Sequence, residues 1–158
     1  MGLPLTTVAA ARDAIKRCVS YTNLDVDKIE IYLVTRAYQV RHGPGPLVNE
    51  HLAESSQISF TDETNVPTLL RGPLRKAVLD LDILHYAIDM DKGINQLIDN
   101  VILVITCLDH ITGQYRLTSL GKLCEYQTES EFVNVIACSL GINQVLLSHS
   151  PNSQFLKV

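Results

Sequence analysis

The amino-acid sequence predicts an α+β fold, a single domain in which a mainly antiparallel sheet is flanked by three or four helices. Three observations support this prediction. The chain has 158 residues, enough for one domain with a core of its own. Hydrophobic residues make up 46% of the chain and charged residues 19%, a balance typical of folded proteins. Some segments alternate in polarity as strands do, and others repeat apolar residues at helical spacing.

The chain divides into three predicted regions: an N-terminal helical arm over residues 1–27, a core over residues 28–148, and a loose tail over residues 149–158. In the arm, Thr6 or Thr7 can cap a helix. The apolar positions of this helix recur every three or four residues, namely Val8, Ala11, Ile15 and Val19.

The core begins with a segment from Lys28 to Arg41 that alternates and is largely apolar on both faces. This pattern predicts one long strand covered on both sides. The Gly-Pro repeat at residues 43–46 ends it, because neither residue continues regular structure easily. We expect a short helix from Leu47 to Ala53 and a brief strand from Gln57 to Thr61.

The segment from Ala77 to Asp91 fits a strand better than a helix. On a helix, its four aspartates would fall on opposite sides and leave no clean apolar stripe. On a strand from Ala77 to Ile88, the aliphatic side chains point inward and the first aspartates outward, which sets Leu79, Leu81 and Ile83 against Asp80 and Asp82.

The second half of the core has clearer signals. We expect a short helix from Ile94 to Asn100, then strands from Val101 to Leu108 and from Gln114 to Leu120, joined by a turn at residues 109–113.

A last helix is predicted from its capping residues. Thr128 and Glu131 have the spacing of a capping box, so a helix should follow and run to Leu140, where Gly141 ends it. Its predicted buried stripe is Phe132, Val135, Ile136 and Leu140.

Charge and hydropathy limit the function. A formal net charge of -4 argues against a protein whose main affinity comes from neutralising phosphates, so direct nucleic-acid binding is not expected. No apolar run approaches the roughly 20 residues of a membrane span. No secretory leader is visible, so we expect an intracellular location, in the cytoplasm or on the inner face of a membrane or virion.

The four cysteines give no disulfide framework, because their spacing is wide. A zinc site could gather Cys107, His110, Cys124 and Cys138, but only Cys107 and His110 have the close spacing of structural zinc ligands. Buried free thiols are the favoured interpretation, and we expect no bound metal and no cofactor.

No catalytic motif stands out. The chain has no phosphate-binding glycine loop, no H-E-x-x-H and no nucleophile elbow. The pairs Asp80/Asp82 and Asp89/Asp91 are typical of a solvated strand face, and His110 of a turn. We expect no enzymatic activity.

The N-terminus matches the myristoylation pattern M-G-x-x-x-[ST], with Gly2 as acceptor. One acyl chain binds membranes only marginally, so a second signal is needed. The expected membrane contacts are the basic residues of the first helix, Arg12, Lys16 and Arg17.

Two further surfaces are candidate contact sites. Basic residues near the predicted strands form a candidate partner patch: Arg36, Arg41, Arg71, Arg75 and Lys76. The Gly-Pro loop carries apolar residues near its tip and is a candidate for self-association: Pro44, Pro46, Leu47 and Val48.

Two stretches resemble the matrix proteins of animal rhabdoviruses. One is Asn65-Val66-Pro67 followed by Arg71-Gly72-Pro73, and the other is Thr112 to Leu120, which is similar to the closing hairpin of that family. The chain departs from the family in lacking a P-P-x-Y motif and a lysine-rich N-terminal arm, and in being acidic.

The resemblance implies a non-catalytic structural or adaptor protein of a negative-strand RNA virus. Such a matrix-like protein self-associates and bridges a membrane surface and the viral nucleoprotein. The alternative is a winged-helix regulator that binds nucleic acid, in which Tyr115 to Gly121 would lead from a wing strand into a helix. That alternative needs a recognition helix just before Val101.

Overall fold

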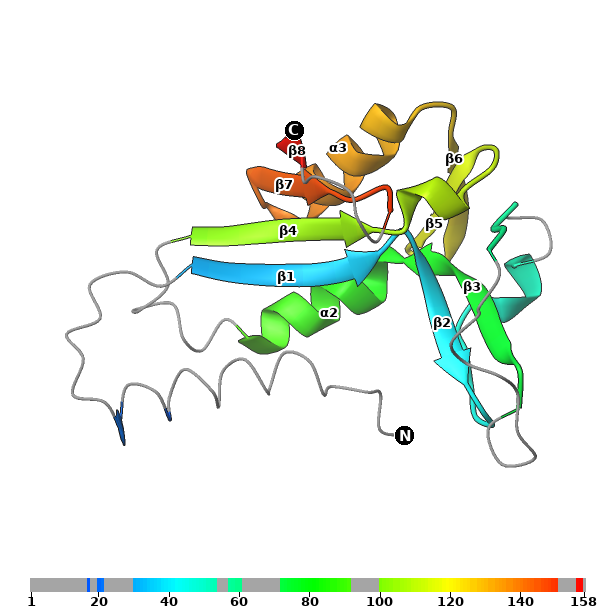
Figure 1. The fold of residues 1–158 in the computed structure, drawn as a ribbon, viewed down its shortest axis with the longest axis horizontal. Coiled ribbons are helices and arrows are strands. Elements are labelled where there is room, and N and C mark those ends of the chain that lie inside the picture. Colours follow the sequence, from blue (N-terminus) through cyan, green and yellow to red (C-terminus); the bar gives the residue numbers. More distant parts are fainter. Residues whose placement is uncertain are drawn as a thin grey trace.

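Two four-stranded sheets and two α-helices make up the part of the chain that the structure describes. The structure is a computed structural model that describes residues 17, 20, 21, 30–53, 57–60, 72–91, 100–150 and 156–157. The two sheets meet at an angle: β1 (Glu30–Arg36) of one sheet and β2 (Tyr38–His42) of the other follow each other in sequence but run in different directions (Figure 1).

The first sheet has three parallel strands and one antiparallel strand. Its spatial order is β1 (Glu30–Arg36), β4 (Asn100–Thr106), β7 (Gln144–Leu147) and β8 (Leu156–Lys157). β4 pairs in parallel with both β1 and β7, and β8 pairs antiparallel with β7. β4 is therefore the central strand, and four consecutive residues of it are buried, Ile102 to Ile105.

The second sheet is also mixed. Its order is β2 (Tyr38–His42), β3 (Leu74–Asp80), β5 (Tyr115–Ser119) and β6 (Lys122–Tyr126). β3 pairs antiparallel with β2 and in parallel with β5, and β5 and β6 form an antiparallel hairpin. The α+β class and the single domain are confirmed. The expectation of a mainly antiparallel sheet is wrong, since three of the six pairings between described strands are parallel.

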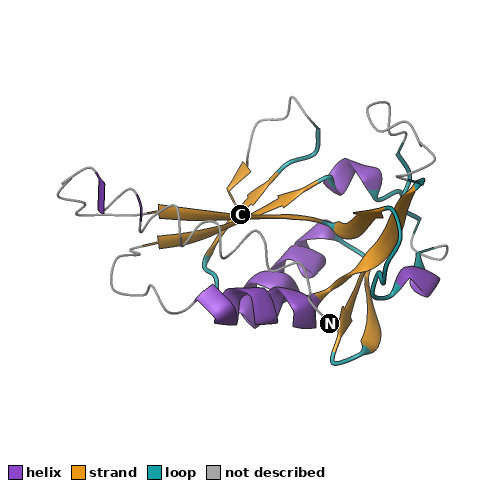
Figure 2. Cartoon of the chain, turned by 90° about the horizontal axis from the view of Figure 1, so that it is seen from below, coloured by secondary structure: helices purple, strands orange, loops and turns teal. Residues whose placement is uncertain are grey.

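Two α-helices have bounds in the described part, α2 (Leu81–Asp91) and α3 (Glu129–Leu140), where three or four were predicted. Two short 3₁₀ helices accompany them, η1 (Glu50–Leu52) and η3 (Leu108–His110). α2 lies to one side of the long strands of the first sheet (Figures 1 and 2).

Two predicted helices fall mostly outside the described residues. Of the N-terminal arm only residues 17, 20 and 21 are described, and they are helical. The predicted helix from Ile94 to Asn100 is described only at Asn100, which begins β4.

The long strand predicted from Lys28 to Arg41 is two strands. The chain breaks at Ala37, which is buried and lies between β1 and β2. The Ala37 N–H still donates to the Thr106 carbonyl at the end of β4, while Tyr38 pairs with Val78 in the other sheet. The alternation of apolar residues continues through the bend, so the sequence pattern did not reveal it.

The strand predicted from Ala77 to Ile88 is wrong beyond Asp80. β3 ends at Asp80, and α2 begins at the next residue. Asp80 accepts a hydrogen bond from the Ile83 N–H at 3.0 Å, the contact of a helix N-cap. Asp80 is buried with 7% of its surface exposed, so its predicted outward direction is also wrong.

The strands from Val101 to Leu108 and from Gln114 to Leu120 are confirmed as β4 and β5. The turn between them does not make a hairpin, because β4 and β5 belong to different sheets. β5 pairs with β6, a strand that was not predicted. Gly121 therefore leads into a strand, and the helix that the winged-helix alternative requires there is absent from this described segment.

The short helix expected from Leu47 to Ala53 is present as η1, although it is shorter and of the 3₁₀ type. The strand expected from Gln57 to Thr61 is not formed at the described residues 57–60. A single antiparallel bridge joins Ile58 to Ile111 there.

The caps and ends of α3 are confirmed. The Thr128 side chain accepts from the Glu131 N–H, the Glu131 carboxylate accepts from the Thr128 N–H, and Gly141 ends the helix with φ of 67°. Such a cap typically stabilises a helix by about 1 kcal/mol.

The buried stripe of α3 differs in part from the prediction. Phe132 and Ile136 are buried as expected, in one core with residues of both sheets. Val133 is also buried, whereas Val135 and Leu140 are only half-buried. The core thus covers a neighbouring face of the helix as well as the predicted one.

Candidate functional site

The most exposed apolar face of any described strand is that of β1. Its side chains alternate between exposed and covered, as they do along a strand with one solvated face. Tyr32 is 52% and Val34 66% exposed, whereas Ile31 on the opposite face is buried. The Tyr32 hydroxyl donates to the Glu30 carboxylate at 3.3 Å, and this negative charge raises the pKa of Tyr32. β1 thus presents an aromatic and a β-branched side chain to solvent.

A second apolar point lies at the tip of the β5–β6 hairpin. Leu120 is 85% exposed and has φ of 50°, a left-handed conformation that leucine rarely adopts. Gly121 follows with φ of 70°, and Leu123 on β6 is 39% exposed. The Asp82 carboxylate holds the tip by accepting from the N–H groups of Leu120 and Gly121 at 3.1 and 3.3 Å.

The loop predicted for self-association projects from the end of β2 (Figure 1). Pro44, Pro46 and Val48 are exposed, and Leu47 is half-buried. A side chain at Gly45 would strike the Arg41 guanidinium, and φ of 113° there favours glycine. The loop is therefore accessible as expected, although its role in self-association remains a prediction.

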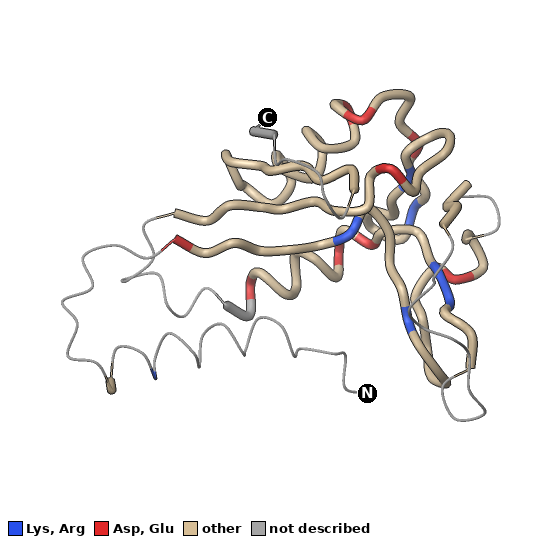
Figure 3. Tube along the Cα trace, viewed as in Figure 1, with Lys and Arg blue, Asp and Glu red and all other residues tan. Residues whose placement is uncertain are grey.

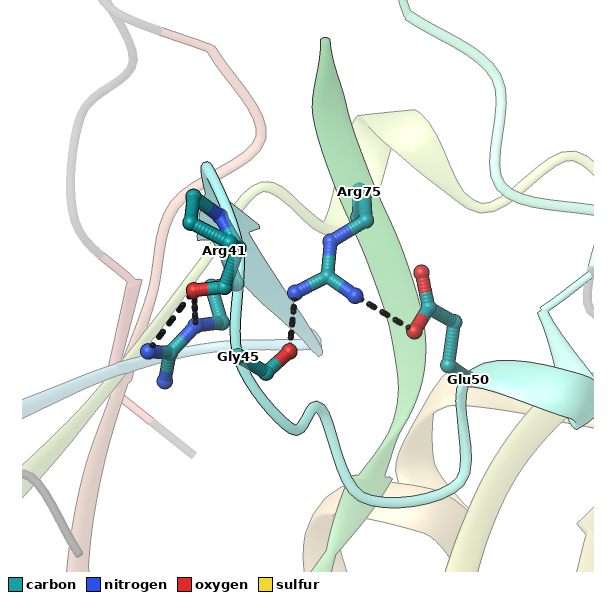
Figure 4. Close-up of polar contacts among 5 residues, drawn as sticks. Arg41, Gly45, Glu50 and Arg75 are labelled. Atoms are coloured by element: carbon teal, nitrogen blue, oxygen red, sulfur yellow. Dashed lines mark hydrogen bonds and ion pairs between the residues drawn. The ribbon is translucent and has the colours of Figure 1, made fainter. Parts of the chain in front are cut away.

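Two arginines fix this loop to the second sheet (Figure 4). Arg41 donates to the Pro44 carbonyl at 3.2 and 3.3 Å. Arg75 lies opposite Arg41 in the β2–β3 pairing, donates to the Gly45 carbonyl at 2.6 Å and forms an ion pair with Glu50 at 2.8 Å. Like charges on paired strands repel each other, and the carbonyl and carboxylate acceptors offset this repulsion.

The predicted basic patch is largely engaged with its own chain. Arg41 and Arg75 hold the loop, and the Lys76 ammonium lies 4.1 Å from the centroid of the Phe60 ring and 3.4 Å from the Ile58 carbonyl oxygen. Arg36 is exposed at the end of β1, and Arg71 lies outside the described residues. Arg41, Arg75 and Lys76 therefore make contacts within the chain.

His110 belongs to an aromatic cluster with Phe60 and Tyr38. Its ring stacks on Phe60 with centroids 4.8 Å apart, and its Nδ1 lies 2.6 Å from the Tyr38 hydroxyl. Burial raises the pKa of Tyr38 to about 12, with Cys107 adding to the rise and Arg36 opposing it. The hydroxyl therefore stays protonated at neutral pH.

The aspartates near the start of α2 also have structural roles. Asp80 caps α2 and accepts from Asn49 at 2.9 Å and from Thr118 at 3.2 Å. Asp82 holds the hairpin tip. The expectation that this pair belongs to a solvated strand face is therefore wrong.

A further polar cluster lies at the first turn of α3. The Glu129 carboxylate accepts from the Tyr115 hydroxyl at 3.1 Å and lies 2.9 Å from His149 Nε2. Burial, followed by the charge of Glu129, raises the pKa of Tyr115 to about 12. This cluster joins the segment after β7 to α3 and β5.

The three described cysteines are free thiols. Cys107 and Cys124 are half-buried and Cys138 is exposed, so the expectation of buried thiols is wrong for Cys138. Within the described ranges, no group of three His, Cys, Asp or Glu side chains could hold a metal ion.

Of the residues predicted to carry the lipid or to contact a membrane, only Arg17 is described. Gly2, Arg12 and Lys16 lie outside the described residues, and Arg17 is described as exposed. Of the helices in the described ranges, none is both long and apolar enough to cross a membrane.

Neither a family model nor a curated protein sequence matches the chain.

The sequence did not single out Tyr32, Val34 or Leu120. Two signals were present. Leu120-Gly121 stands between two alternating segments, the position of a hairpin turn. Tyr32 and Val34 belong to an alternating segment whose two faces are both apolar, and sequence alone does not tell which face a neighbouring element covers.

Proposed function

We propose that the protein is a non-catalytic structural or adaptor protein that self-associates, a matrix-like protein of a negative-strand RNA virus. The partners that follow from this proposal are further copies of the chain, a membrane surface and the viral nucleoprotein. The viral and matrix parts of the proposal rest on the two short stretches of resemblance.

One observation supports the self-association most directly. Large apolar side chains are exposed at two separate places, Tyr32 and Val34 on the first sheet and Leu120 and Leu123 on the second. A layer of subunits needs at least two different contact surfaces on each copy, since a single surface closes into a dimer. Exposed apolar groups at two points support this kind of assembly.

The roles of the polar residues support a non-catalytic protein. Asp80, Asp82 and His110 would be the first candidates for acid–base chemistry, and each has a defined packing or capping contact within the chain. An acid or base in an active site instead faces an open site with room for a substrate.

Sedimentation velocity over a wide range of protein concentrations tests the proposal. The wild-type chain should form reversible dimers and larger species as concentration rises. Leu120→Asp should reduce the larger species, because a charge on an apolar contact is costly to desolvate. Lys122→Glu is the matched control, since Lys122 is exposed on the same hairpin and carries no exposed apolar group. A chain that stays monomeric at every concentration would contradict the proposal.

Co-sedimentation with anionic and with neutral liposomes tests the membrane partner. Binding that is stronger to anionic vesicles and falls with added salt is expected if basic residues make the contact. Equal recovery in the supernatant with both vesicle types would remove the membrane from the proposal.

A further inference from the structure

β1 is an edge strand with its outer side open among the described elements. The order of the first sheet is β1-β4-β7-β8, so no described strand pairs with β1 on the side away from β4 (Figure 1). An open edge presents a row of N–H and C=O groups that can pair with another strand. Natural edges are commonly protected by proline, by lysine or by a bulge. The sequence of β1, EIYLVTR, contains neither proline nor lysine.

The backbone contacts fix which residues face outward. The Ala37 N–H donates to the Thr106 carbonyl at 2.9 Å, and the Thr35 carbonyl accepts from the Thr106 hydroxyl at 3.1 Å. The peptide groups of odd-numbered residues of β1 therefore point to β4. Since the direction alternates along a strand, those of the even-numbered residues point to the open side: Glu30, Tyr32, Val34 and Arg36.

The charges of β1 are placed symmetrically about its centre. Glu30 is the first residue and Arg36 the last, each three positions from Leu33. Figure 3 shows the acidic colour at one end of β1 and the basic colour at the other. Both side chains are exposed and lie on the same face as Tyr32 and Val34.

We infer that β1 is the contact strand for a second copy of this chain, paired antiparallel about a two-fold axis at Leu33. In this register Glu30 of each copy lies opposite Arg36 of the other, and Tyr32 lies opposite Val34. Each of these two pairings occurs twice across the axis, which gives four pairs. All of them join even-numbered residues, whose peptide groups face outward, so each is a hydrogen-bonded pair. The pairing brings opposite charges together at both ends and aromatic with β-branched side chains between them, both of which stabilise cross-strand contacts.

Other registers lose these contacts. Moving the axis by one residue, to Tyr32 or Val34, keeps the even-numbered residues in pairs but shortens the overlap and leaves both Glu30 and Arg36 without an opposite charge. A parallel pairing of two β1 strands would place like charges beside each other. The two-fold register about Leu33 is therefore the one that uses the whole strand.

The contact joins two sheets into one. The first sheets of two subunits would continue across the axis as a single sheet, with Tyr32 and Val34 of both copies in one apolar strip. One strand per subunit makes a small interface, below about 1,200 Å², so the dimer should be weak and depend on concentration. This inference rests on the proposed self-association and names one of its surfaces.

Charge exchange across the axis tests the register. Glu30→Arg places two arginine side chains opposite each other at both ends of the paired strands, and Arg36→Glu places two glutamate side chains there. Each variant alone should dimerise about tenfold or more weakly than the wild type. Mixed in equal amounts, the two variants should form a heterodimer, because both end pairs are then complementary. The double variant Glu30→Arg/Arg36→Glu should dimerise like the wild type.

Lys122→Glu changes the net charge by the same amount as Arg36→Glu but lies on β6 in the other sheet, and it should leave the dimer unchanged. Thermal melting of each variant checks that it folds. Val34→Pro removes the Val34 N–H, which points to the open side, and leaves the hydrogen bonds between β1 and β4 in place. This variant should therefore also weaken the dimer.

The outcomes separate this inference from the proposed function. Single variants that weaken the dimer and a mixture that restores it support the pairing. Folded single variants that dimerise like the wild type, or a mixture that stays monomeric, overturn it while leaving self-association through another surface. A wild-type chain that remains monomeric overturns both.

Discussion

The Asp82 carboxylate, in the first turn of α2, accepts a hydrogen bond from the backbone N–H of Leu120 at the tip of the β5–β6 hairpin, across 3.1 Å. Its other oxygen accepts from Gly121 at 3.3 Å. An exposed leucine in a left-handed turn is thus held in place by a helix from another part of the chain. We expect this contact to keep the hairpin tip rigid enough to serve as a contact surface.

Replacing Asp82 tests that role. Asp82→Ala should lower the free energy of unfolding by about 1 kcal/mol, because two hydrogen bonds to a partly exposed carboxylate are lost. Amide hydrogen exchange at Leu120 and Gly121 should speed up much more than exchange in β4. Unchanged exchange at both amides would show that Asp82 does not hold the tip.

Asp80 should be far more sensitive than its position in an alternating segment indicates. Asp80→Ala removes the cap of α2 and leaves the half-buried Asn49 amide and the buried Thr118 hydroxyl without this acceptor. We expect a loss of about 2–4 kcal/mol by chemical denaturation. Asn134→Ala, an exposed change on α3, is the control and should stay within about 0.5 kcal/mol. Equal midpoints for the two variants would contradict the buried cap.

The contacts of Arg75 should order the loop after β2. Arg75→Lys keeps the charge but cannot reach both the Gly45 carbonyl and Glu50 with a planar fork. Stability should fall by at most about 1 kcal/mol, since the ion pair is partly exposed, while limited proteolysis within residues 43–48 should become faster. Proteolysis at the wild-type rate would mean that the loop is ordered by other contacts.

The Tyr38 hydroxyl should titrate about two pH units above an ordinary tyrosine. Folding favours its protonated form, so its contribution to stability is present below pH 10 and is lost as the pH rises through about 12. Tyr115 behaves similarly, with a pKa of about 12. Tyrosinate absorbance should therefore show one late-titrating group fewer in Tyr38→Phe than in the wild type. Superimposable curves above pH 11 would argue against the buried hydroxyl.

Some elements could be predicted because their signals are local. The capping residues Thr128 and Glu131 and the terminating Gly141 lie in the helix they define, and α3 was predicted with nearly the observed ends. β4 was predicted from a continuous apolar run, which suits a central parallel strand buried on both faces.

The remaining elements depend on contacts between distant parts of the chain. The alternation of Leu79, Asp80, Leu81 and Asp82 imitates a strand, and the helix begins at Leu81 because Asp80 caps it and Asp82 reaches the hairpin 38 residues later. The bend at Ala37 has no turn residue, since it is set by the divergence of two sheets. Likewise, the exposure of Tyr32 and Val34 follows from which face of β1 remains uncovered.

The most direct test of self-association is sedimentation velocity of the wild-type chain from micromolar to millimolar concentration, beside the equimolar mixture of Glu30→Arg and Arg36→Glu. We predict that the wild type shifts from monomer to dimer as concentration rises, that each variant alone shifts about tenfold later, and that the mixture shifts like the wild type. A wild-type chain that sediments as a monomer at every concentration would contradict the account.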